Sequence, residues 1–148
     1  MQTVKQKLNL LDYTLYLAWV VSVVATLGSL YFSEIMGYIP CELCWYQRIM
    51  MYPLSLILGI AAYTNEKNLK KYILPMSVVG GCISLFHYLE QKVPYLATIK
   101  PCTRGVPCNV DYINWFGFVT IPFLALIAFI LITLLMAWTR PNGARSDG

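Results

Sequence analysis

Four long apolar segments alternate with short polar ones along the chain. They cover residues 11–32, 45–63, 72–89 and 116–138. A helix that crosses the hydrocarbon core of a bilayer needs about 20 mostly apolar residues, which is close to the length of each segment. The pattern therefore predicts four transmembrane helices, with residues 139–148 as a short flexible tail.

Charged residues are almost absent from these segments. The first segment has none after Asp12, the second has Arg48 near its start, and the fourth has none. Trp45 and Trp138 lie at segment ends, where amphipathic rings prefer the membrane interface. The first segment is longer than the apolar part of a signal peptide, so we expect it to remain as a membrane anchor.

The overall composition is also typical of a membrane protein. Of the 148 residues, 58% are hydrophobic and 12% are charged, and the mean hydropathy is +0.59. Soluble domains carry about 25% charged residues, and a core this small could not hide so much apolar surface from water. We predict an all-α membrane protein, a four-transmembrane-helix bundle that forms a single domain over residues 1–148.

The distribution of lysine and arginine predicts how the bundle is oriented. The side with both termini and the middle loop (Lys67, Lys70 and Lys71) carries seven of these residues, and the other side carries four. The richer side faces the cytoplasm. We therefore expect cytoplasmic termini, extracytoplasmic segments at 33–44 and 90–115, and a multi-pass protein of the cell membrane. The scattered charges form no basic stripe, which argues against nucleic-acid binding.

Four of the five cysteines fall in the two outward segments, as the pairs Cys41–Cys44 and Cys102–Cys108. Cys82 lies within the third apolar segment and is expected to be a small apolar filler. The outward compartment permits disulfides, so both pairs could be structural bridges. A bridge across two residues adds little stability, however, and C-x-x-C spacing lowers a thiol pKa and supports reversible redox chemistry.

Metal and haem sites are alternatives for the same cysteines. A zinc site of four thiolates would use an unusual five-residue gap between Cys102 and Cys108, and no histidine stands among the cysteines in the sequence. Covalent haem attachment needs a histidine after the second cysteine, where this chain has Trp45. Redox chemistry at Cys41–Cys44 is the prediction, with no metal.

Cys44 is expected at the start of the second helix, where the backbone amides favour an anion. Arg48 follows one helical turn later on the same face, and both effects stabilise a thiolate. A guanidinium at the membrane edge could simply reach toward lipid headgroups. Beside a thiolate it suggests instead a site for a lipid-soluble electron acceptor such as a quinone. His87 is expected at a similar depth and could bond a quinone carbonyl, whereas Glu90 is expected to be a solvated carboxylate.

The second pair lies in a segment rich in proline and glycine, which predicts an exposed loop. Lys100 and Arg104 flank its cysteines and would favour attack by a thiolate. A soluble protein can reach such a loop more easily than a site at the membrane surface. We therefore expect a relay in which electrons enter at Cys102–Cys108 and leave through Cys41–Cys44.

The four segments, the two cysteine pairs and the run Pro-Cys-Glu-Leu-Cys-Trp-Tyr-Gln-Arg over residues 40–48 resemble the DsbB family. The likeness covers nearly the whole chain and is nearest to the short Bacillus-type members, called BdbC. The resemblance implies a quinone-dependent thiol:disulfide oxidoreductase. Such an enzyme reoxidises a DsbA-like thioredoxin-fold partner outside the membrane and passes the electrons to the membrane quinone pool, either menaquinone or ubiquinone.

The resemblance also implies a role for each outward cysteine. Cys102 would form the mixed disulfide with the partner, and Cys108 would be its disulfide mate. Cys41 would exchange with this pair, and Cys44 would be the thiolate that contacts quinone.

Two further residues complete the site that the resemblance implies. Arg48 would hold the quinone, and His87 would lie near its ring. The five-residue gap between Cys102 and Cys108 departs from the enterobacterial members of the family, in which the second pair is widely separated. This departure bears on how far the two sulfurs move apart during the relay.

Other classes of protein share some of these features. A vitamin K epoxide reductase-like enzyme also combines a helical bundle, a C-x-x-C motif and quinone, but its motif is expected near the end of a late helix. A non-enzymatic membrane protein with structural disulfides is a second alternative. A cation or metal-binding transporter component ranks lowest, because the apolar segments carry no carboxylate beyond Asp12 at the start of the first one.

Overall fold

The computed structural model describes residues 2–93, 95–98, 102–103, 105–108, 110 and 112–139, without the side chains of 2–12, 67 and 97. The predicted C-terminal tail beyond Thr139 lies outside these residues. Lys100 and Arg104, which were expected to favour attack on the second cysteine pair, also lie outside them.

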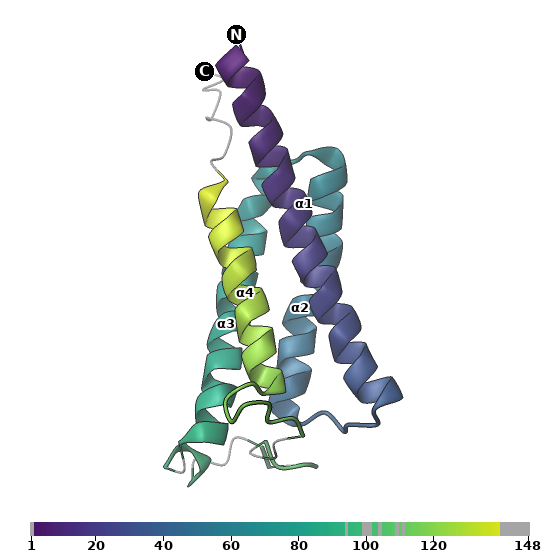
Figure 1. Ribbon diagram of the computed structural model, residues 1–148, viewed down its shortest axis with the longest axis vertical. Coiled ribbons are helices and arrows are strands. Elements are labelled where there is room, and N and C mark those ends of the chain that lie inside the picture. The colour runs from purple at the N-terminus through teal and green to yellow at the C-terminus, as the bar shows by residue number, and fades with distance from the viewer. Residues whose placement is uncertain are drawn as a thin grey trace.

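The regular structure in the described part of the chain is helical (Figure 1). Its elements are α1 (Gln2–Leu30), the π-helical turn η1 (Tyr31–Ile35), α2 (Glu42–Thr64), η2 (Lys67–Leu69), α3 (Lys70–Lys92), η3 (Leu96–Thr98) and α4 (Ile121–Trp138). A β-bridge joins Trp115 and Val119. The all-helical class predicted from the sequence is confirmed.

Among the described residues, three stretches are long and apolar enough to cross a membrane, namely Tyr13–Ile35, Lys70–Lys92 and Ile121–Trp138. α2 is also 23 residues long, but its first turns carry the polar side chains of Glu42, Gln47 and Arg48, which lower its mean hydropathy. The structure therefore has three candidate spans and a fourth helix beside them. That α2 also crosses the membrane remains a prediction.

The fourth helix begins later than the sequence pattern indicates. We predicted a helix from residue 116, but α4 begins at Ile121. Phe116 and Gly117 have φ angles of 54° and 82°, in the left-handed region that cannot continue an α-helix. They form a tight turn that the bridge at Trp115 closes, and apolar composition alone does not reveal such a turn.

The four long helices pack as a ring in which α1 contacts α2 and α4, and α3 contacts α2 and α4. Leu54 and Leu58 of α2, Ile73 of α3 and Phe129 of α4 are fully buried between them. A Cβ atom at Gly80 would lie 2.3 Å from Cε1 of Phe129. The missing side chain at this glycine therefore allows α3 and α4 to approach closely.

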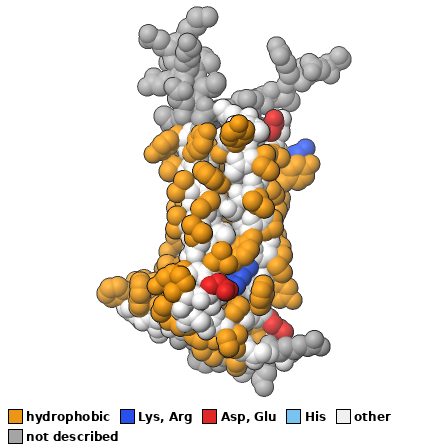
Figure 2. Space-filling model, turned by 90° about the vertical axis from the view of Figure 1, so that its right-hand side faces the viewer, with side chains coloured by type: hydrophobic (Ala, Val, Ile, Leu, Met, Phe, Trp, Pro, Cys, Tyr) orange, Lys and Arg blue, Asp and Glu red, His pale blue; other side chains and the backbone are white. Residues whose placement is uncertain are grey.

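The outside of the bundle is apolar. Figure 2 shows hydrophobic side chains along the length of one face, and residues such as Leu56 and Ile60 are 71% and 57% exposed. Soluble monomers rarely expose such continuous apolar surface. Lipid can cover this apolar surface, so the chain is a multi-pass membrane protein.

The cysteine-bearing segments meet at one end of the bundle. In Figure 1, the connection before α2 and the long connection before α4 lie together at the bottom. The start of α1 and the end of α4 lie at the opposite end. This antiparallel arrangement brings the two cysteine pairs into one place.

Candidate redox site

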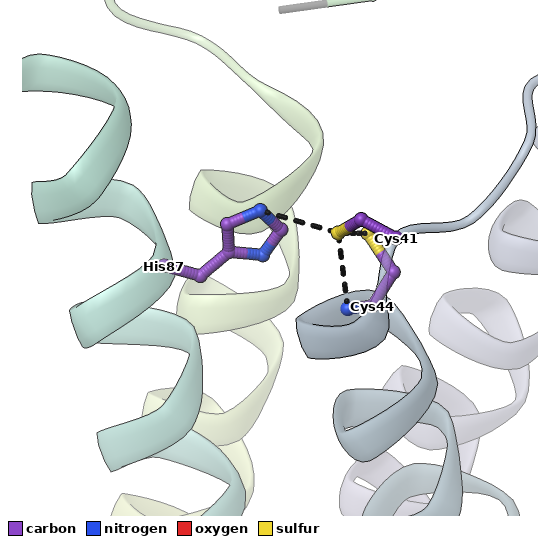
Figure 3. Close-up of side chains that lie close together, drawn as sticks. All are labelled: Cys41, Cys44 and His87. Atoms are coloured by element: carbon purple, nitrogen blue, oxygen red, sulfur yellow. Dashed lines mark hydrogen bonds between the residues drawn. The ribbon is translucent and has the colours of Figure 1, made fainter. Parts of the chain in front are cut away.

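The first cysteine pair is built into the start of α2. Cys41 is the residue that caps this helix, with extended backbone angles (φ −74°, ψ 174°), and its sulfur accepts a bond from the N–H of Cys44 at 3.4 Å. The Sγ atoms of Cys41 and Cys44 are 2.9 Å apart, and Figure 3 shows the hydrogen bond between them. Capping by the first cysteine therefore turns both sulfurs toward each other.

The two thiols differ in acidity, and both precede the predicted span 45–63. The hydrogen bond donated by Cys41 lowers the pKa of Cys44, and burial opposes this effect. Backbone hydrogen bonds at the helix start and the charge of Arg48 lower this pKa further. The pKa of Cys41 is raised, first because its proton is held by Cys44 and second because it is buried. Cys44 is therefore the thiolate of the reduced pair.

Arg48 lies one turn deeper in α2. Its guanidinium donates to the carbonyl oxygen of Ser29 in α1 at 3.1 Å and lies 5.5 Å from the centre of the Trp45 ring. These contacts fix the cation inside the bundle, whereas a side chain reaching for lipid headgroups would point away from it. Part of the hydrogen-bonding capacity of Arg48 is therefore used by the backbone of α1.

A cavity of 470 Å³ opens beside the first cysteine pair, between α1, α2 and α4. Cys44, Gln47 and Arg48 contribute polar groups to its wall, and most of the remaining lining is apolar. Small-molecule sites usually measure about 300–1,000 Å³ and combine apolar walls with a few polar groups. The cavity fits a molecule with a polar head and an apolar body.

His87 does not line this cavity. Its ring is buried with 1% exposure, and its Nε2 lies 3.6 Å from Sγ of Cys41 and 3.1 Å from the carbonyl oxygen of Cys108. Gln47 lies 3.1 Å from the other ring nitrogen, Nδ1. Since a carbonyl only accepts, Nε2 carries the hydrogen and Nδ1 accepts from the Gln47 amide. His87 thus joins the two cysteine pairs (Figure 3 shows its contact with Cys41).

The second pair, Cys102 and Cys108, forms a disulfide. The sulfur-bearing residues differ in exposure, because Cys102 is half-buried whereas Cys108 is 2% exposed. Cys108 packs with Cys41 and Leu43, against Phe86 of α3. The exposed loop that the proline and glycine content predicts is therefore only partly right, because the end of α3 covers its second cysteine.

Three hydrogen bonds of Glu42 and Gln91, which sequence reasoning missed, hold this loop in place. The carboxylate of Glu42 accepts from the backbone N–H of Thr103 at 3.1 Å. The amide of Gln91 donates to the carbonyl oxygens of Cys108 and Val110 at 3.5 and 3.4 Å. From the sequence, Glu42 indicates only an acidic side chain that interacts favourably with the start of a helix. It in fact connects the first pair to the backbone of the second.

Glu90 is not the solvated carboxylate expected from the sequence. It is 5% exposed, and its Oε2 has no hydrogen-bond partner among the described residues. One of its carboxylate oxygens lies within 4.8 Å of the sulfurs of Cys102 and Cys108. The fold of the second loop over the end of α3 buries this side chain.

In the folded protein, a histidine lies beside the first cysteine pair, although none is near it in the sequence. The sulfurs of Cys41 and Cys44 and a ring nitrogen of His87 lie within 4.8 Å of one another, so a histidine does stand among the cysteines. The four-thiolate set considered above is nevertheless not formed, because Cys102 and Cys108 are bonded to each other. Cys82 is exposed on α3 and takes no part in either pair.

The arrangement orders the four sulfurs from the loop surface to the cavity. Cys102 is half-buried, Cys108 and Cys41 are buried side by side, and Cys44 lines the cavity. Thiol–disulfide exchange moves electrons between sulfurs that can approach one another. The site can therefore carry two electrons from a dithiol at the loop to an acceptor in the cavity.

The chain is similar to known proteins that are described as disulfide bond formation proteins. The family model for the disulfide bond formation protein DsbB matches residues 12–139. Disulfide bond formation protein C of Bacillus subtilis (strain 168) is 67% identical over 133 residues, covering 90% of this chain and 95% of that protein. No solved structure matches the chain.

Two other relatives extend the likeness. A probable disulfide formation protein C 1 of Bacillus anthracis is 56% identical over 123 residues, covering 83% of this chain and 88% of that protein. A probable disulfide formation protein of Coxiella burnetii (strain CbuK_Q154) is 44% identical over 131 residues, covering 86% and 88%.

Proposed function

Because the chain belongs to the DsbB family and is thus a membrane disulfide oxidoreductase, we propose that its electron acceptor is quinone. We further propose that its electron donor is an extracytoplasmic DsbA-like thioredoxin-fold protein. The observation that carries this proposal is the order of the sulfurs, from half-buried Cys102 to cavity-lining Cys44.

In the first step, a thiolate of the reduced partner attacks Sγ of Cys102. The Cys102–Cys108 bond breaks, a mixed disulfide forms, and Cys108 leaves as a thiolate. The second thiol of the partner then resolves the mixed disulfide, so the partner becomes oxidised and Cys102 and Cys108 become a dithiol. The greater exposure of Cys102 supports it as the sulfur under attack.

In the second step, Cys108 attacks Sγ of Cys41 in the oxidised first pair. The Cys41–Cys44 bond breaks and Cys44 leaves as the thiolate, which its lowered pKa favours. Cys102 then displaces Cys41 from Cys108, so the second pair is again a disulfide and the first pair is a dithiol.

The cavity is the proposed quinone site. Its apolar wall suits an isoprenoid-substituted ring of either menaquinone or ubiquinone, and Arg48 would bond a ring oxygen next to Cys44. Quinone, when bound, supplies the capacity to take up two electrons and two protons. Arg48 holds positive charge at this end of the cavity, and the residues of α1 and α4 exclude water from it.

We propose that His87 acts on sulfur and does not touch the quinone ring, which differs from the role that family resemblance implies. Its Nε2–H is directed at Cys41 and the carbonyl of Cys108, and Gln47 holds the opposite nitrogen. In this position it keeps Cys41 next to the second pair during exchange.

The energetics favour quinone over thiol buffers as the acceptor. A strongly oxidising DsbA-like protein has a potential near about −120 mV, and tenfold in equilibrium corresponds to about 30 mV for two electrons. Glutathione-type buffers are too reducing to reoxidise it, whereas a quinone pool renewed by respiration drives the flow. The excess of Lys and Arg on the side of the termini supports an extracytoplasmic position for both pairs.

Purified protein mixed with a reduced DsbA-like protein and a short-chain quinone analogue tests this function. Loss of quinone absorbance should be catalytic in the wild-type protein and absent in Cys44→Ser. Cys82→Ala is the matched control and should keep nearly full turnover, because Cys82 is exposed on α3 away from both pairs. Full turnover in Cys44→Ser would exclude the proposed route.

A further inference from the structure

The proposed relay leaves one buried acid unused, Glu90 in the last turn of α3. Its side chain is 5% exposed, although it lies two residues from the end of the helix. Oε2 is buried and bonded to nothing in the described part of the chain. A carboxylate without a partner is costly to bury, so such an acid calls for a chemical reason.

The surroundings of Glu90 favour its neutral form at rest. The last turn of a helix carries partial negative charge, which disfavours a second negative charge there. α4 contributes no ionisable side chain, and Lys92 is directed at the carbonyl of Gly117 at 2.9 Å. Glu90 is therefore expected to hold a proton while the disulfide beside it is intact.

The disulfide beside Glu90 creates a need for that proton. When Cys102 is attacked, Cys108 must leave as a thiolate at a position that is 2% exposed. A thiolate buried in apolar surroundings is disfavoured. A carboxylate oxygen of Glu90 lies within 4.8 Å of both sulfurs, which one rotamer change or one bridging water can span.

We propose that Glu90 is a proton-transferring catalytic residue of the Cys102–Cys108 pair, an inference that rests on the proposed function. Its carboxylic acid gives a proton to the departing Cys108 sulfur. The products are the mixed disulfide at Cys102, a Cys108 thiol and a Glu90 carboxylate. No proton crosses the protein surface in this step.

The same proton returns in the next step of the relay. Cys108 must become a thiolate before it attacks Cys41, and the Glu90 carboxylate takes up its proton. The Cys41–Cys44 bond then breaks and the electron pair goes to Cys44. Glu90 ends the relay protonated, as it began, so one residue serves as acid and then as base.

Reduction of the outer pair alone tests this role. In a Cys41→Ser/Cys44→Ser protein, dithiothreitol reduces Cys102–Cys108, and the product is trapped with a maleimide and counted by mass spectrometry. The rate per dithiothreitol thiolate should fall as the pH rises through the titration of Glu90, because the donating acid disappears. Adding Glu90→Gln should lower the rate about 100-fold at low pH and remove this fall.

Control variants separate catalysis from folding. Glu34→Gln makes the same chemical change at an exposed acid and should keep the parent rate and profile. Glu90→Asp keeps a titrating carboxyl with a shorter reach, so the pH-dependent fall should survive at a lower rate. The ionisable side chains of His87, Lys92 and Glu42 at this end of the bundle are unchanged in all of these proteins.

Two results would overturn the role of Glu90. One is a Glu90→Gln protein with the parent rate and pH profile, and the other is a parent whose rate per thiolate does not depend on pH. The second needs no folded variant. Neither measurement uses quinone or a protein partner, so failure of the proposed function appears separately, as a wild-type protein that does not reduce quinone.

Discussion

At the scale of single residues, the first turn of α2 favours the proposed direction of electron flow. Cys41 caps the helix and donates to Cys44, so the two thiols of one motif acquire opposite acidities. Arg48 adds positive charge on the side of Cys44. The sulfur that lines the cavity is therefore the better leaving group, and Cys41 is left for exchange with the second pair.

The acidity of Cys44 should be visible in a titration of the reduced protein. An ordinary cysteine has a pKa near about 8.5, and the lowered pKa means that one thiolate persists as the pH falls below that range. Cys41→Ala should move the titration back toward higher pH, because it removes the thiol that donates to Cys44. Thiolate absorbance in the ultraviolet measures this shift. A Cys44 thiol that titrates at the same pH in the variant and the wild-type protein would contradict the assignment.

Replacing Arg48 should weaken quinone binding. Arg48→Met keeps the length of the side chain but removes a charged donor worth about 1.5–3 kcal/mol, which corresponds to roughly a 10–100-fold rise in KM for quinone. Steady-state quinone reduction measures this KM. Lys71→Met, at the start of α3 and the opposite end of the bundle, is the control. An unchanged KM would mean that Arg48 bonds the Ser29 carbonyl and does not contact quinone.

At the scale of elements, the ends of α2 and α3 hold the second loop. Glu42→Ala removes the acceptor for Thr103 N–H and should slow transfer between the pairs several-fold, whereas Glu42→Gln keeps an acceptor oxygen and should retain most of the rate. Single-turnover reduction of Cys41–Cys44 by the partner measures this step. Equal rates in both variants and the wild-type protein would show that the bond does not position the loop.

The helices can largely be predicted from the sequence. An apolar run long enough to span a bilayer as a helix is seldom compatible with another structure. The start of α4 does not follow, since a turn at Phe116 and Gly117 is as apolar as the helix beyond it. The contacts of His87 and Glu90 do not follow either. They join positions far apart in the chain, such as Cys41 and His87, which are 46 residues apart.

At the scale of the whole molecule, the bundle places the two cysteine pairs where lipid and water are both close. Its apolar sides suit lipid, and the cavity between α1, α2 and α4 is largely apolar. The two pairs meet at the end of the bundle, where a soluble protein and a lipid-soluble acceptor can both approach. Because Cys108 and Cys41 already pack together, the proposed relay should require little movement of the loop, even with the short gap between Cys102 and Cys108.

We propose that electrons cross from the second pair to the first through Cys108 and Cys41. The most direct measurement is a disulfide map of the Cys44→Ser/Cys102→Ser protein after mild oxidation, compared with Cys44→Ser/Cys108→Ser. We predict a Cys41–Cys108 bond in the first protein, formed faster than any Cys41–Cys102 bond in the second. Free Cys41 and Cys108 thiols after oxidation, or bonds only to Cys82, would contradict the account.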